Sequence, residues 1–204
     1  MNHRILLRSA AVAALACVLL ASARAEDETV TKRQGSYTNS KGASGSTSST
    51  TTRSNGVVTR QGTWTNAAGG TGTRQSQTTW NKATGTATVN GSVTRPNGAT
   101  ATWQGTKERT APGVVQSQGT ITQANGKKDT YSATTTKVAP GSWDTNRVVT
   151  AANGKTINQT VDTTVVNGQG TRTVTTTGPN GQTVTRDSTF TQTASTAPIA
   201  PPTH

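Results

Sequence analysis

Hydrophobic and polar residues alternate with a period of two along most of residues 29–192, a pattern that predicts half-buried β-strands. In the segment 156–166, Ile157, Val161 and Val165 share one face, and the threonines between them take the other. Threonine and valine are β-branched and favour extended backbone even where little surface is buried. The sequence therefore predicts strands with one thin apolar face and one face of hydroxyl and amide groups.

Turn-forming glycines separate these segments about every 14 residues. They are Gly42, Gly56, Gly70, Gly85, Gly98, Gly113, Gly126, Gly141, Gly154, Gly168 and Gly181. Most follow Asn or Pro, and Asn-Gly between β-prone runs predicts a two-residue hairpin with a type I′ turn. Two strands and two turns then form one repeat of about 28 residues.

The pattern predicts an all-β fold, in which an antiparallel meander of about twelve strands forms 28-residue hairpin repeats. The hairpin repeat domain is expected to cover residues 56–192. Such a sheet could stay open, coil or close into a barrel, and a β-solenoid is the alternative. A transmembrane barrel is disfavoured, because one Phe, two Tyr and four Trp cannot build two aromatic girdles across twelve strands.

The two ends of the chain depart from the repeat. Residues 1–25 have the three-part layout of a secretory signal peptide, so we expect export to the periplasm, the outer surface or the extracellular space. An uncleaved anchor and lipidation at Cys17 are the alternatives. Residues 26–55 are predicted to be an acidic start and a low-complexity Ser/Thr/Gly segment with weak strands. Residues 193–204 are predicted to be a Pro-rich disordered tail.

Composition narrows the classes of function. Hydrophobic residues make up 29% of the chain, and no leucine follows Leu20, which excludes a packed helical domain or an α/β enzyme core. After residue 25 there is no cysteine, and the only histidine is His204, so Cys/His and Ser/His/Asp catalysis and most zinc sites are excluded. Asp129 and Asp162 are interpreted as solvated strand residues and not as a glycosidase pair. We expect no enzyme activity, no catalytic residue, no metal and no cofactor.

Charge supplies the candidate chemistry, because the chain has a formal net charge of +12. One interpretation is a cationic sheet that binds polyanions such as lipopolysaccharide, acidic polysaccharide or extracellular DNA. The candidate polyanion-binding residues are Arg60, Arg74, Arg95, Arg109, Arg147, Arg172 and Arg186. The candidate residues for stacking on sugars or bases are Trp64, Trp80, Trp103 and Trp143. The alternative is that the charges keep polar β-repeats soluble and block edge-to-edge pairing.

The array of Thr, Gly, Gln and Asn over residues 33–192 resembles the Thr/Gly-rich β-repeat proteins exported by Gram-negative bacteria, and is loosely similar to curli-type and adhesin repeats. The resemblance is compositional and transfers no functional residue. The leading hypothesis is a non-enzymatic exported protein of the cell envelope or surface that is structural, adhesive or self-assembling into an oligomer or fibre. The alternative is a cationic binding module for polyanions. Ice binding through threonine ladders is disfavoured, because Arg60 and Arg95 are expected beside the threonine rows.

Overall fold

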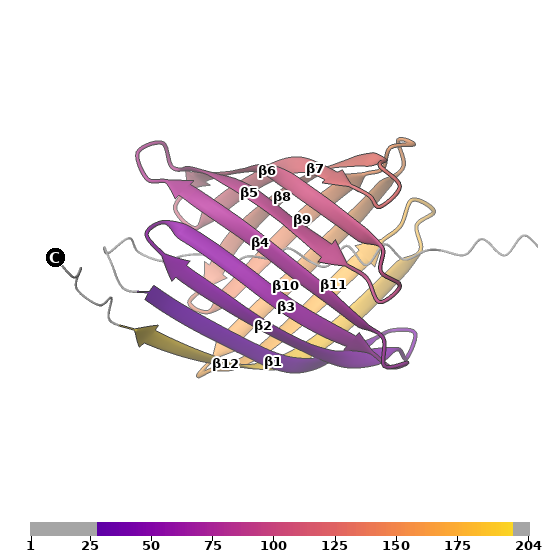
Figure 1. Ribbon diagram of the computed structural model, residues 1–204, viewed down its shortest axis with the longest axis horizontal. Coiled ribbons are helices and arrows are strands. Elements are labelled where there is room, and N and C mark those ends of the chain that lie inside the picture. The colour runs from indigo at the N-terminus through magenta and orange to yellow at the C-terminus, as the bar shows by residue number, and fades with distance from the viewer. Residues whose placement is uncertain (1–27, 198–204) are drawn as a thin grey trace, which may run out of the picture.

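The computed structural model describes residues 28–197, which form a closed barrel of twelve antiparallel strands (Figure 1). The strands are β1 Glu28–Asn39, β2 Ser44–Ser54, β3 Val57–Asn66, β4 Thr71–Asn81, β5 Thr86–Thr94, β6 Thr100–Ala111, β7 Val114–Thr122, β8 Lys128–Ala139, β9 Ser142–Thr150, β10 Thr156–Val166, β11 Gln169–Thr177 and β12 Thr183–Ala197. The predicted twelve-strand antiparallel meander is confirmed. Of the forms left open, the structure has the closed barrel, so the solenoid alternative is wrong. The predicted signal peptide, residues 1–25, lies outside the described residues.

The first and last strands close the barrel and lie side by side in Figure 1. They pair in continuous register from Glu28 opposite Ala197 to Asn39 opposite Arg186. Beyond the last pair, the backbone N–H of Ser40 donates to the carbonyl of Thr185 at 2.7 Å. We call the β1–β12 junction the seam. Because of the seam, no strand among the twelve presents an unpaired edge.

The turns confirm the hairpin prediction in part. Asn55 and Asn167 have φ of 48° and 49° and precede glycines with positive φ, as a type I′ turn requires. At the other Asn-Gly pairs that form turns, only the glycine has positive φ. At one turn Gly69, with φ of 77°, takes the position that the spacing assigned to Gly70.

The two segments predicted to have little regular structure, residues 26–55 and 193–204, both contain regular β-strand. Residues 44–54 form the full strand β2, which pairs along its length with β1 on one side and β3 on the other. Two hydrogen-bonded neighbours and inward packing, as at Thr51 with 5% exposure, compensate for the lack of apolar side chains. At the other end, β12 continues to Ala197, and residues 198–204 of the predicted tail lie outside the described residues.

Alternate residues of each strand differ in burial, and the buried face points into the barrel. In β10, Gln159, Val161 and Thr163 are buried, whereas Thr160 and Asp162 between them are exposed. The buried face points inward because the convex outer face of a closed barrel is the one open to solvent, and arginine electrostatics across the barrel agree with this. Burial, and repulsion by guanidinium groups that include those of Arg74 and Arg60, lower the pKa of Arg172 from its usual value. Residue 172 is on β11, five strand positions from β4, so these groups interact through the interior. We call the two faces the inner wall and the outer wall.

Glycines on the inner wall accommodate aromatic rings from neighbouring strands. The directly opposed pairs are Trp64 with Gly72, Trp103 with Gly91, Phe190 with Gly170, Tyr37 with Gly45 and Tyr131 with Gly119. In every pair a Cβ added to the glycine would come closer to an atom of its partner than real Cβ atoms do. In these five pairs the aromatic side chain therefore needs a neighbour without a side chain.

Candidate anion-binding inner wall

Charge is sorted between the two walls of the barrel. The buried and half-buried cationic side chains of the inner wall are Arg33, Arg53, Arg60, Arg74, Lys107, Arg147, Arg172 and Arg186. Arg109 and Lys137 have the same phase but are exposed near the ends of β6 and β8. The acidic residues Glu108, Asp144, Asp162 and Asp187 fall at outer-wall positions of β6, β9, β10 and β12. The sorting follows from the two-residue period, since every one of these arginines is an even number of residues from a buried or aromatic position of its own strand.

Five of these arginines form a cluster of like charge within the barrel. The guanidinium groups of Arg74, Arg186, Arg60 and Arg147 all repel that of Arg172, and this repulsion adds to burial in lowering its pKa. On the strands, Asp129 is the one acidic residue at an inner-wall position of the described chain. Its carboxylate accepts from the Gln123 side-chain amide at 2.6 Å and from the Ala152 N–H at 3.0 Å. The cluster therefore has a strongly positive electrostatic potential, which favours the binding of an anion.

Aromatic rings orient several of the guanidinium groups. The guanidinium carbon of Arg186 lies 3.8 Å from the centroid of the Tyr37 ring, and that of Arg74 lies 5.2 Å from a Trp103 ring centroid. Stacking uses the face of the guanidinium plane and leaves the N–H groups at its edge able to reach an acidic group. Arg60 is held in a different way, because its Nε donates to the Thr51 hydroxyl at 3.1 Å.

Further polar groups of the inner wall are buried without a hydrogen-bond partner among the described residues. They include the indole N–H groups of Trp103 and Trp143 and the hydroxyl of Tyr131. Burial raises the pKa of Tyr131, against a smaller opposing effect of Arg147, so the hydroxyl stays protonated and is a potential donor. A buried donor with no acceptor costs about 1–3 kcal/mol, which a ligand or a water molecule would recover.

The structure brings together most of the residues that the sequence proposed. Arg60, Arg74, Arg147, Arg172 and Arg186 share the inner wall, as do all four tryptophans, of which Trp103 contacts one of these arginines. The other two candidates, Arg95 and Arg109, lie at the ends of strands.

Arg95 lies in the turn after β5, two residues beyond the inner-wall Val93, and its Nε is buried. Arg109 has the inner-wall phase, opposite Val115, but is exposed near the end of β6, where the register of pairing shifts. Arg33, Arg53 and Lys107 are inner-wall cations that were not among the residues predicted from the sequence. The signal that identifies them is their phase within the strand. Arg33 and Arg53 are each two residues from a buried threonine, Thr31 and Thr51, and Lys107 is four residues from Trp103.

The outer wall consists mainly of threonine, serine, glutamine and asparagine. The expectation that Arg60 lies beside the threonine rows is wrong, because Arg60 pairs with Thr51 and Ser76 on the inner wall. None of the seven aromatic residues of the chain is at an outer-wall position. Apolar outer-wall residues are a few valines, such as Val148 with 40% exposure.

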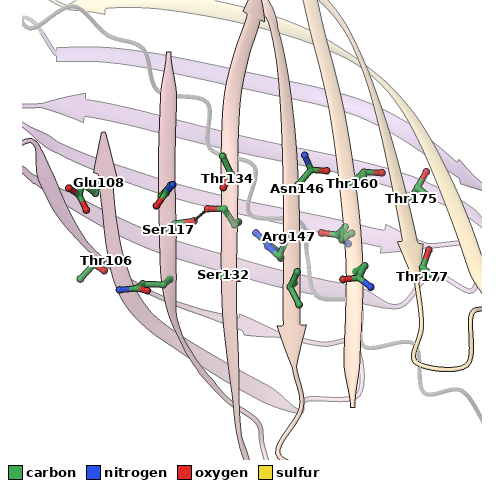
Figure 2. A pocket seen from close by; sticks show the side chains of 16 residues that line it. Thr106, Glu108, Ser117, Ser132, Thr134, Asn146, Arg147, Thr160, Thr175 and Thr177 are labelled. Atoms are coloured by element: carbon green, nitrogen blue, oxygen red, sulfur yellow. Dashed lines mark hydrogen bonds between the residues drawn. The ribbon is translucent and has the colours of Figure 1, made fainter. Parts of the chain in front are cut away.

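The outer wall has two shallow hollows. One, of about 520 Å³, extends across β6 to β11, which lie side by side in Figure 2. It is lined by residues that include Gln116, Gln118, Asn146 and Asn158. The second, of about 610 Å³, extends across β4 to β8 and is lined mainly by hydroxyl and amide side chains. Within residues 28–197 there is no helix able to span a membrane, and no group of three His, Cys, Asp or Glu side chains is placed to hold a metal ion.

No protein-family model and no curated protein matches the sequence. Solved structures do share the fold. A structure titled "KdgM porin" superposes with a TM-score of 0.58 at 6% identity, covering 80% of this chain and 98% of the porin. A second, titled "KdgM porin in complex with disordered oligogalacturonate", superposes with a TM-score of 0.55 at 5% identity, covering 80% of this chain and 97% of that one. The chain therefore has a twelve-stranded barrel fold similar to that of these porins.

Proposed function

We propose that this chain is a non-enzymatic barrel of the cell envelope that binds an anionic polymer, such as an acidic polysaccharide, against its inner wall. The observation that carries the proposal is the sorting of charge, with eight buried or half-buried cationic side chains inward and the strand carboxylates, apart from Asp129, outward. One porin of similar fold was solved with oligogalacturonate, an anionic glycan, which supports this class of ligand. Export to the envelope is part of the proposal.

The inner wall suits a chain of acidic groups better than a single anion. The cations come from strands all around the barrel, so a linear polyanion within it would meet guanidinium groups from several directions. Arg60, Arg74 and Arg172 are half-buried as whole residues, whereas the Nε atoms of Arg74 and Arg172 are shielded from solvent. Each charge-assisted hydrogen bond that a ligand forms there contributes about 1.5–3 kcal/mol.

Replacing two of the clustered arginines tests the proposal. The double variant Arg74→Gln with Arg172→Gln is expected to bind polygalacturonate or heparin about a hundredfold more weakly than the unchanged chain, measured by titration calorimetry at low salt. The matched control is Lys32→Gln with Lys128→Gln, which removes the same charge from exposed outer-wall positions. The control is expected to keep its affinity. Equal losses in both variants, or no binding by the unchanged chain at low salt, would contradict binding at the inner wall.

A transmembrane pore is the second candidate, and it is favoured by the similarity to porins. The outer wall argues against it, because a lipid-facing wall needs an apolar band with aromatic girdles. Here that wall carries threonine rows, such as Thr63, Thr73, Thr94 and Thr100 in successive register. Desolvating such hydroxyl groups in hydrocarbon is unfavourable unless each finds a partner.

Detergent phase partition separates the two candidates. The folded chain is expected to remain in the aqueous phase of a Triton X-114 separation, because its outer wall is hydrated. The same preparation should give no conductance steps in a planar bilayer. Recovery in the detergent phase, together with stepwise conductance, would instead establish the pore.

A further inference from the structure

The outer wall has a chemistry unlike that of the inner wall, and the proposed function does not use it. From β2 to β5 every outer-wall strand position carries an uncharged residue, almost all of them threonine, serine, glutamine or asparagine. The uncharged side chains form rows across the strands. One row runs through Thr59, Gln77, Asn90, Gln104 and Thr120, directly opposite one another in register on β3 to β7.

The hollow over β4 to β8 overlaps this uncharged region at β4 and β5. Its lining includes Gln75, Asn90 and Gln104, and its one charged residue is Lys128. The amide side chains of these three residues are exposed and make no side-chain hydrogen bond to any other residue of the part that the structure describes. Turn asparagines differ, since Asn66 and Asn81 accept hydrogen bonds from the backbone. The hollow thus presents donors and acceptors that the fold does not need.

Three kinds of partner fit this wall poorly. A polyanion needs clustered cations, which lie on the other side of the sheet. A protein interface is centred on buried aromatic or arginine anchors, and the outer wall carries no aromatic residue. A lipid surface needs an apolar band. Uncharged amides and hydroxyls in rows instead match a partner that is itself uncharged and dense in hydroxyl groups.

We propose that the outer wall over β4 to β8 docks a neutral polysaccharide. Neighbouring strands are about 4.8 Å apart, so a row presents one hydrogen-bonding side chain per strand at a spacing close to the length of one hexose unit. A glycan chain lying across the strands would meet Asn90, Gln104 and Thr120 in sequence. The hollow of about 610 Å³ has room for a few sugar units.

Retention on insoluble neutral glycans tests this proposal. The full chain is expected to be retained on cellulose, chitin or curdlan at high salt, because no charge is involved. The pair Asn90→Ala with Gln104→Ala is expected to lose at least tenfold in affinity for the glycan that retains the unchanged chain. The matched control, Gln34→Ala with Gln61→Ala, removes two exposed outer-wall amides that lie outside both hollows and is expected to keep its affinity.

Other outcomes would overturn the inference. These are no retention on any of the three glycans, retention abolished by salt, binding to lipid vesicles in place of glycan, or an equal loss in the control pair. The inner-wall variant Arg74→Gln with Arg172→Gln is expected to be retained like the unchanged chain. Failure of polyanion binding would therefore leave this inference intact, and failure of glycan docking would leave the inner-wall site intact. Circular dichroism of each variant verifies that the barrel is folded.

Discussion

Deletion of residues 183–204 is expected to convert the barrel from a monodisperse species into a strongly aggregating one. The deletion removes β12, so β1 and β11 each lose a hydrogen-bonded neighbour over nine or more residue pairs. Two long unpaired edges template pairing with other chains, and the opened sheet also exposes its inner valines and tryptophans. Thioflavin fluorescence and light scattering of the truncated chain are expected to rise steeply with concentration.

The matched control for this truncation is deletion of residues 198–204 alone, which leaves every pair of the seam in place. That chain is expected to behave like the full-length chain in both measurements. A truncated chain that lacks β12 and still elutes as a monomer would contradict the importance of closure. Fibre formation by the full-length chain would instead support the self-assembling interpretation of the sequence.

Gly72→Ala is expected to lower the free energy of unfolding by about 2–3 kcal/mol, a large effect for one methyl group. The three atoms closest to a Cβ at this position all belong to the Trp64 ring, which would have to leave its place over Gly72. Chemical denaturation followed by tryptophan fluorescence measures the change.

A double-mutant cycle isolates the cause. In a Trp64→Ala background, the same Gly72→Ala change is expected to alter the free energy of unfolding by less than about 0.5 kcal/mol, because the clash no longer exists. Gly178→Ala is the control in the unchanged background, since its Cβ would meet only a carbonyl oxygen at 3.7 Å and its φ is not positive. A similar loss at Gly72 with and without Trp64 would show that the backbone, and not the ring, requires glycine there.

The sequence was enough to predict the total of about twelve strands, the strands from β3 onward and the division of those strands into two faces, but it predicted only weak strands where β1 and β2 form. The alternation predicts that Val58 and Thr59 point to opposite faces of the sheet, and the structure confirms this. This information is local, because the period of two is a property of one strand. Closure is not local, since it depends on β1 meeting β12 across more than 150 residues of sequence, and no motif marks that pairing.

The candidate site was predicted less completely for the same reason. The prediction placed Arg60 on the polar face because arginines are usually exposed to solvent. Arg60 and Val58 have the same phase, and both face inward. Counting phase within each strand would have added Arg33 and Arg53. The aromatic–glycine pairs needed more than phase, because Trp64 and Gly72 become neighbours only through the register of β3 with β4.

The backbone of each strand approaches only that of its two sheet neighbours, and this has a consequence for how such a chain can change its size. An additional hairpin, inserted at a turn, would add two strands and widen the barrel while every existing register stayed intact. The two sides of the arginine cluster would then move apart, which would suit a bulkier anionic ligand. A single residue inserted within a strand would instead reverse the two faces of that strand. The arginines beyond the insertion would point outward and the threonines inward. Barrels of this architecture are therefore expected to evolve by the gain and loss of whole hairpins.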